Sequence, residues 1–169
     1  MKYTSATQSP GLPSSSLRMY YSRVLAYLTA AATVAAGTYV QYFSYDILWL
    51  VPYTLLYPHL AHQIDLRFRH AHAQRVRVVL LAVDALHVGV CAVLMSFAIV
   101  PSLLLMMILS FATLLSGSLR LLGVTLLITA STALLLGSWL QPEFKDSTPA
   151  LVALVCILFS TLCIATTAY

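Results

Sequence analysis

The sequence has few charged residues. Asp, Glu, Lys and Arg make up only 8% of its 169 residues, about a third of the share that is typical of soluble domains. Hydrophobic residues account for 60% instead, more than a single core could bury, so an ordinary water-soluble domain is excluded. Because an apolar helix of about 20 residues crosses the hydrocarbon of a bilayer, the length allows roughly six crossings with short turns. No room is left for a separate soluble catalytic domain.

Cysteine and acidic residues are also scarce. The three cysteines, Cys91, Cys156 and Cys163, lie in apolar runs without the paired spacing of a metal site or disulfide framework, so we interpret them as buried thiols. Nine Lys and Arg residues exceed five Asp and Glu, which gives a formal net charge of +4. In a soluble protein this balance could indicate nucleic-acid binding. Here the basic residues lie between apolar runs and indicate orientation in a membrane, so we expect no nucleic-acid partner.

The chain divides into a polar tail and an apolar remainder. Residues 1–17 are rich in Ser, Pro, Thr and Gly and are predicted to be a flexible cytoplasmic tail. Residues 18–169 are predicted to form one all-α membrane domain with six transmembrane helices. The predicted spans are residues 23–43, 44–64, 78–98, 101–117, 121–140 and 149–167. Pro52 and Pro58 fall inside the second span, where each removes a backbone hydrogen bond and is expected to kink the helix.

Basic residues gather on one side of the predicted membrane. Lys2, Arg18, Arg23, Arg67, Arg69, Arg75, Arg77 and Arg120 all fall on that side, and only Lys145 falls on the other. The positive-inside rule therefore places both termini and the basic turn between the second and third spans in the cytoplasm. The aromatic residues Tyr39, Tyr42, Phe43, Tyr45, Trp49 and Trp139 suit the outer membrane interface, and Tyr20 and Tyr21 suit the inner one.

The five histidines lie within one stretch of the chain, from Tyr57 to Gly89. Two of them, His70 and His72, belong to the basic turn, together with Arg67, Arg69, Arg75 and Arg77. The positive charges of the turn would repel a bound cation. We therefore interpret it as a solvated basic turn near anionic lipid headgroups.

Four polar residues lie deeper in the predicted second and third spans. His59 and His62 are three apart and share a helix face, and Asp84 and His87 do the same. His59 and Asp84 lie at matching depths, about 10–12 Å in from the basic turn at 1.5 Å rise per residue. A carboxylate at this depth is costly unless it faces the bundle and finds a partner, so we predict that Asp84 interacts with His59.

Three interpretations of these four residues remain open. Asp84 and an imidazole could form a structural lock between two helices. The group could instead be a ligand or proton site used for sensing. Three imidazoles and a carboxylate could also hold a metal or haem, but the sequence supplies no tighter signature, so we predict no metal and no cofactor.

The hairpin carries motifs that resemble a known family. These are "YPHLAHQ" at the end of the second span and "DALHVGVCAVLMSFAIVPS" in the third, with "LRMYYSRVL" before the first span and "DSTP" before the last. Over residues 17–169 the chain resembles the membrane-associated sensor domain family, type two. Members form the N-terminal membrane unit of bacterial diguanylate cyclases and class III adenylate cyclases. Pro58, His59 and Asp84 match the polar elements of the family.

The resemblance implies a sensory and anchoring domain of the bacterial inner membrane. It would perceive a membrane or periplasmic cue and regulate a C-terminal cytoplasmic cyclase, as a homodimer in the lipid bilayer and with a possible lipid-like ligand. The chain has no GGDEF motif and no cyclase aspartate pair, so we expect an excised sensor or a stand-alone relative rather than an enzyme. The alternatives are a small transporter or channel that uses His59, Asp84 and His87, and a haem-binding membrane subunit.

Overall fold

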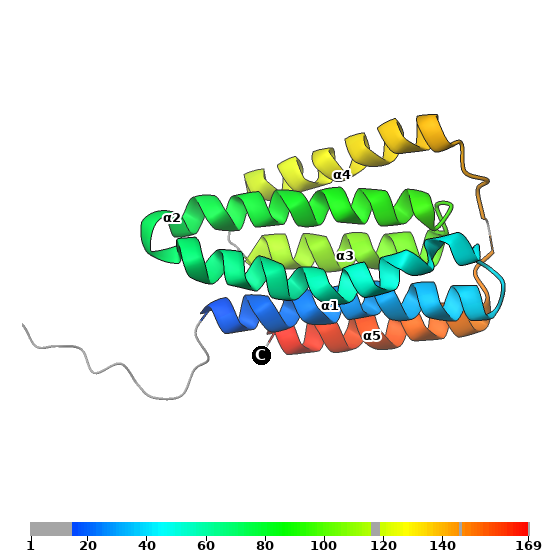
Figure 1. Ribbon diagram of the computed structural model, residues 1–169, viewed down its shortest axis with the longest axis horizontal. Coiled ribbons are helices and arrows are strands. Elements are labelled where there is room, and N and C mark those ends of the chain that lie inside the picture. The colour runs from blue at the N-terminus through cyan, green and yellow to red at the C-terminus, as the bar shows by residue number, and fades with distance from the viewer. Residues whose placement is uncertain (1–14, 116–118, 146, 169) are drawn as a thin grey trace, which may run out of the picture.

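The computed structural model describes residues 15–115, 119–145 and 147–168, without the side chains of residues 15, 16, 18, 69–73, 167 and 168. These residues form five α-helices and one short 3-10 helix, as Figure 1 shows. The elements are α1 (Ser15–Tyr39), η1 (Tyr45–Trp49), α2 (Leu50–Leu94), α3 (Ile99–Leu115), α4 (Leu119–Leu140) and α5 (Ala150–Ala168). The prediction of an all-helical chain is confirmed.

Helix α2 is a hairpin. It reverses direction near its middle, so that a first arm (residues 50–68) and a second arm (Gln74–Leu94) lie antiparallel, and the bundle has six helical rods (Figure 1). The reversal falls within Asp65 to Arg77, where a turn was predicted, although these residues belong to α2 rather than to a loop. Arginine, alanine and glutamine favour helix, and the long arginine stems can reach water while the backbone stays helical. The start of α1, the reversal of α2 and the end of α5 lie at one end of the bundle, called here the hairpin end (Figure 1).

The helix bounds differ from the predicted spans by a few residues. Residues 15–17, expected in the tail, already belong to α1, and residues 1–14 lie outside the described set. Predicted span 23–43 ends early, because the chain turns after Tyr39. Two helical segments, Gln74–Leu94 and Leu119–Leu140, are long and apolar enough to cross a membrane by length and composition; the apolar helices Ile99–Leu115 and Ala150–Thr166 are shorter.

Many large apolar side chains face outward from the bundle. They are exposed on α4 and α5 in particular, and Leu135 and Trp139 of α4 are 72% and 78% exposed. The interior holds apolar residues such as Leu50, Met95 and Val152, together with alanines, the three buried thiols and threonines. Hydrogen bonds to carbonyls of their own helices are donated by Thr29, Thr33, Thr38, Thr113 and Thr129. This distribution is the one that membrane helices adopt, because lipid solvates leucine and small residues allow close packing. The prediction that Cys91, Cys156 and Cys163 are buried thiols is confirmed.

The end of the bundle opposite the hairpin end is closed by aromatic and basic side chains. Phe43 is buried against Gly37, whose carbonyl accepts hydrogen bonds from the backbone N–H groups of Tyr42 and Phe43. Phe43 is therefore a core residue of the bundle rather than an outward-facing one. Lys145 Nζ donates a hydrogen bond to the backbone carbonyl of Tyr42. It also lies 4.6 Å from the centroid of the Tyr42 ring. Tyr39 and Trp139, by contrast, are exposed at this end, as expected of an aromatic belt.

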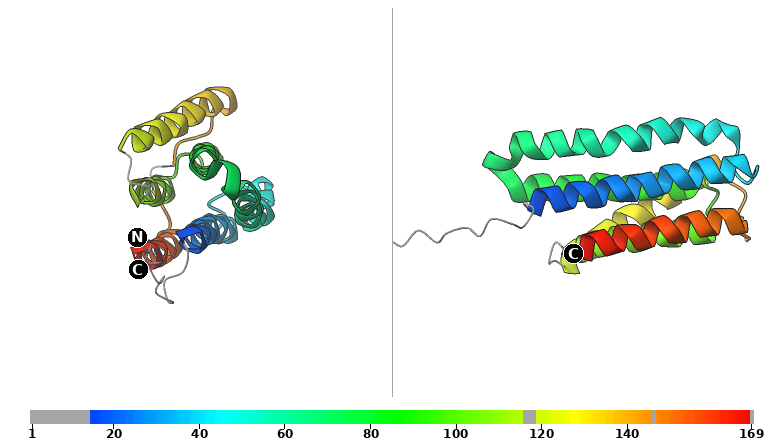
Figure 2. Two further views of the ribbon diagram at one scale, coloured as in Figure 1. Left: turned by 90° about the vertical axis from the view of Figure 1, so that its left-hand side faces the viewer. Right: turned by 90° about the horizontal axis from the view of Figure 1, so that it is seen from below.

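Helix α4 lies on the outside of the bundle, against α2 and α3 (Figure 2). Its closest approach is to the second arm of α2 at Gly89, where an added Cβ would lie 2.8 Å from the carbonyl oxygen of Thr129. Thr129 Oγ1 donates to the carbonyl of Ala85 at 3.1 Å, which joins the same two helices. Glycine at position 89 thus sets the spacing between α2 and α4.

We expect Gly89→Ala to lower the thermal unfolding midpoint of the detergent-solubilised protein, because the new methyl group would push the α4 backbone away. Gly123→Ala is the matched control, since nothing lies within 4 Å of its added Cβ. Alanine is the better helix former by up to about 1 kcal/mol, so that variant should be neutral or more stable. Equal midpoints for the two variants would contradict the close approach.

Candidate functional site

One face of α1 carries most of the polar contacts between helices. Tyr20, Arg23 and Tyr27 follow one another at intervals of three and four residues, so they line up on the side of α1 that packs against α2. Each of them bonds a polar residue of α2. The contacts of Arg23 and Tyr27 are partly buried in the bundle, whereas the contact of Tyr20 with His59 is exposed.

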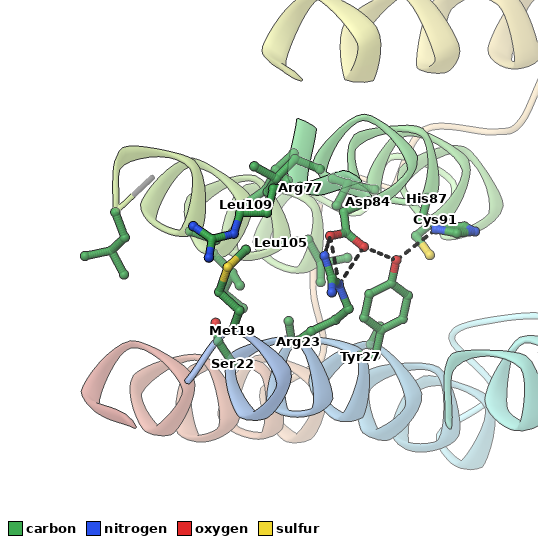
Figure 3. A pocket seen from close by; sticks show the side chains of 17 residues that line it. Met19, Ser22, Arg23, Tyr27, Arg77, Asp84, His87, Cys91, Leu105 and Leu109 are labelled. Atoms are coloured by element: carbon green, nitrogen blue, oxygen red, sulfur yellow. Dashed lines mark hydrogen bonds and ion pairs between the residues drawn. The ribbon is translucent and has the colours of Figure 1, made fainter. Parts of the chain in front are cut away.

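A cavity lies beside this face. It has a volume of about 340 Å³ and is bounded by α1, the second arm of α2 and α3 (Figure 3). Arg23, Tyr27, Asp84 and His87 line it together with apolar side chains, among them Cys91. The polar network is thus part of the wall of a ligand-sized space.

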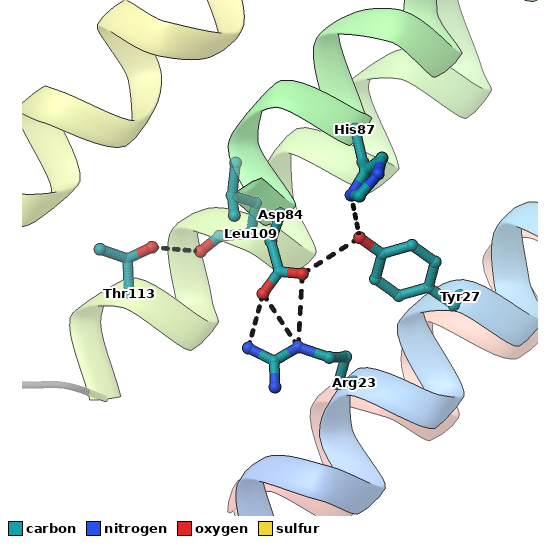
Figure 4. A network of polar contacts seen from close by, with 6 residues as sticks. All are labelled: Arg23, Tyr27, Asp84, His87, Leu109 and Thr113. Atoms are coloured by element: carbon teal, nitrogen blue, oxygen red, sulfur yellow. Dashed lines mark hydrogen bonds and ion pairs between the residues drawn. The ribbon is translucent and has the colours of Figure 1, made fainter. Parts of the chain in front are cut away.

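The centre of the network is an ion pair between α1 and α2. Arg23 donates to the carboxylate of Asp84 from Nη2 at 2.8 Å and from Nε at 3.0 Å and 3.3 Å (Figure 4). The two side chains are only 8% and 13% exposed. Each charge compensates the other, and a bidentate guanidinium–carboxylate contact fixes the relative rotation of both helices.

A chain of hydrogen bonds leads from the ion pair to the first arm of α2. The Tyr27 hydroxyl donates to Asp84 Oδ1 at 3.0 Å and lies 2.8 Å from His87 Nδ1 (Figure 4). Because the single proton of Tyr27 is used on Asp84, His87 Nδ1 must carry the proton of the second bond. His87 Nε2 is in turn hydrogen-bonded to the Tyr53 hydroxyl. His87 is thereby held between two tyrosines.

Aromatic rings enclose His87. The centroid of Tyr57 lies 4.4 Å from that of His87 in an edge-on arrangement, and Tyr53 lies at 5.2 Å. Tyr57 also lies 4.8 Å from Tyr27. The three tyrosines come from α1 and the first arm of α2, so this aromatic group joins all three rods around the ion pair.

His59 and His62 form a separate contact nearer the hairpin end. The Tyr20 hydroxyl lies 2.8 Å from His59 Nδ1, and the Tyr20 ring lies 4.3 Å from the ring of His62. The predicted interaction of His59 with Asp84 is therefore wrong. Asp84 pairs with a stronger partner, since a guanidinium offers both charge and two parallel donors whereas an imidazole offers one donor.

Arg23 has a different role from the one expected. As the first charge of an apolar run it was counted with the basic residues that orient the chain, but its side chain is buried and paired. Arg67 and Arg75 are exposed near the reversal of α2 and Arg120 at the start of α4, as expected, and Arg77 is exposed and lines the cavity. The side chains of Arg18, Arg69, His70 and His72 lie outside the described residues, as does Lys2.

The two prolines of the first arm differ in position. Pro52 lies in the first turn of α2, where a backbone N–H group has no partner within the helix. Proline removes no helical hydrogen bond at this position, so the reason for which a kink was expected at Pro52 does not apply. Pro58 is inside the helix and buried, and its missing N–H leaves the carbonyl of Thr54 without its usual donor. Pro58 precedes His59 and follows Tyr57, at the level where the first arm contacts α1.

The described residues contain no group of three or more His, Cys, Asp and Glu side chains able to hold a metal ion.

The four residues that were predicted as one polar cluster form two separate contacts. His59 and His62 contact Tyr20, and Asp84 and His87 contact Tyr27. Sequence reasoning missed Tyr20, Arg23, Tyr27, Tyr53 and Tyr57. The regular spacing of the first three residues was a usable signal, because a lone arginine in an apolar helix also needs a partner.

Comparison with known proteins gives one match. The family model described as the MASE2 domain matches residues 18–107, which include α1, both arms of α2 and the first half of α3. All residues of the polar network lie within this stretch. No curated protein and no solved structure matches the chain, and no catalytic domain is detected in it.

We expect Arg23→Gln and Asp84→Asn each to destabilise the protein by about 3–5 kcal/mol, because each leaves the other charge buried without compensation. The double variant should lose much less than the sum of the two. Thermal unfolding in detergent measures all three, with Glu143→Gln on an exposed loop as the control for losing a carboxylate. Effects that add to within about 0.5 kcal/mol would show that the pair is not coupled.

Proposed function

Since the chain belongs to the MASE2 domain family, we propose that it is a sensory and anchoring domain of the bacterial inner membrane that regulates a cytoplasmic nucleotide cyclase. The cyclase, a diguanylate or adenylate cyclase, would follow α5. The observation that carries the proposal is the family match, which covers every residue of the polar network. Outward-facing leucines, together with small and hydroxyl side chains packed inside the bundle, support a bundle embedded in lipid.

The proposed orientation places the hairpin end in the cytoplasm. The start of α1 and the end of α5 both lie at that end (Figure 1). The chain therefore crosses the bundle an even number of times and ends on the side where it began. Arg67, Arg75 and Arg77 are exposed near the reversal of α2, and Arg120 is exposed at the start of α4. An excess of exposed arginine on one side is the positive-inside signature.

Helix α1 provides a route from the polar network to α5. On one side it holds Asp84 through Arg23, and on the other it packs along α5. Thr33 Oγ1 lies 3.0 Å from Cys156 Sγ, and Cys163 Sγ donates to the carbonyl of Ser22 at 3.5 Å. A cue that shifts α1 would therefore move α5 with it. In a homodimer, rotation or separation of the two α5 helices would change how two cyclase domains meet.

For topology, we expect a reporter fused after Tyr169 or within residues 71–75 to report cytoplasm. A reporter fused at Glu143 should report the opposite side, because the loop that contains it lies at the other end of the bundle. A periplasmic signal from the fusion within residues 71–75 would contradict the proposed orientation. Matched expression of all fusions, checked by immunoblot, controls for unequal protein levels.

For coupling, we expect the register of the helix after α5 to set the output of a cyclase joined after Tyr169. Insertion of one residue rotates the following helix by about 100°, whereas insertion of seven nearly restores its phase. Cyclase activity in membranes should therefore change more with one added residue than with seven. Equal activities would indicate a passive anchor and would count against sensory coupling.

A further inference from the structure

The cavity beside the ion pair has one apolar wall and two walls that carry polar side chains among apolar ones. The wall formed by α3 consists of Leu105, Ile108, Leu109, Ala112 and Leu115. The charged groups come from the other two helices, with Arg23 on α1 and Arg77 and Asp84 on α2 (Figure 3). A ligand in this space would meet hydrocarbon along one side and charge along the other.

Two guanidinium groups, of Arg23 and Arg77, line the cavity. Each carries five N–H donors, so a guanidinium that already has one partner can still donate to a further anionic oxygen. Arg23 uses Nε and Nη2 for Asp84, and among the described residues no hydrogen bond is made to its Nη1. The lining therefore complements an anionic group better than a neutral or cationic one.

The cavity is elongated along the bundle. Its lining on α2 runs from Arg77 near the hairpin end to Cys91, a separation of about 21 Å at 1.5 Å rise per residue. At the Cys91 end, Ala30, Cys91 and Leu105 belong to the hydrophobic core of the bundle. The space thus has charge near the hairpin end and in its middle, and apolar core residues at its other end.

We propose that this cavity binds a single-chain amphiphile with an anionic headgroup, such as a fatty-acid carboxylate. The headgroup lies between Arg77 and Arg23, and the alkyl chain runs along α3 toward Leu105. This inference rests on the proposed sensory function and names the chemical class of the cue. Because the headgroup competes with Asp84 for Arg23, binding weakens the tie between α1 and α2 and gives a physical link from ligand to α1.

The test uses the full chain in phosphatidylcholine nanodiscs and a dodecanoate probe with a photoactivatable diazirine on its alkyl chain. After irradiation, peptide mass spectrometry locates the labelled residues. We expect labelling on the α3 wall between Leu105 and Leu115, and its displacement by unlabelled dodecanoate. Dodecanol, which lacks the charge, and butyrate, which lacks the chain, should displace at least tenfold less at the same concentration.

Variants test the two halves of the site separately. Arg77→Gln should weaken displacement by dodecanoate at least tenfold, whereas Arg75→Gln removes an equal charge from a residue that does not line the cavity and should have no effect. Ala26→Leu fills the space from α1 and should also reduce labelling. Unfolding midpoints confirm that each variant is folded, and wild-type labelling decides the location whether or not a variant folds.

Two results would overturn the inference. One is labelling spread over the outward faces of α4 and α5 without displacement, which is simple partition into lipid. The other is equal displacement by dodecanol, which would remove the need for an anionic headgroup. A fused cyclase separates this failure from that of the proposed function. If the fused cyclase responds to dodecanoate while α3 is unlabelled, only the proposed binding site is rejected. If the cavity is labelled but the cyclase does not respond, only the proposed sensory function is rejected.

Discussion

The arrangement of the bundle depends on the need of one buried carboxylate for a counter-charge. Asp84 lies far from the ends of an apolar helix, where an unpaired charge would cost several kcal/mol. Arg23 meets this need with three donor contacts, and these contacts fix how α1 and the second arm of α2 face each other. Once that rotation is set, Tyr27 reaches Asp84 and His87, and Tyr20 reaches His59.

Around this polar centre the bundle is held together by close packing rather than by exclusion of water. Glycine at position 89 allows α4 to contact α2, and threonines satisfy their hydroxyls on backbone carbonyls inside the bundle. Lipid solvates the leucines of α4 and α5 as well as protein would, so these side chains gain little from burial. Small and hydroxyl side chains therefore take a large share of the interior, beside buried apolar residues such as Leu50 and Met95.

Helix α1 occupies the central position in this structure. It contributes Arg23 and Tyr27 to the polar network, forms one wall of the cavity, and packs along α5 on its other side. The family match contains the whole network and the cavity lining of α1 and α2, but only Leu105 of the α3 wall. A movement of α1 is thus the shortest physical connection between a ligand beside Asp84 and the helix at the proposed output.

The sequence by itself determined the helical class, the location of the helices to within a few residues, the burial of the three cysteines and the depth of Asp84, because apolar runs and their interruptions are local properties. It also showed that Asp84 needs a partner. Only the tertiary structure decided that the partner is Arg23, which is 61 residues away, and not His59. A carboxylate in an apolar helix is satisfied by whichever donor its neighbours bring to its level, and that depends on helix order and rotation. The tyrosines around His87 went unnoticed for the same reason, since each is an ordinary membrane residue until three rods place them around one imidazole.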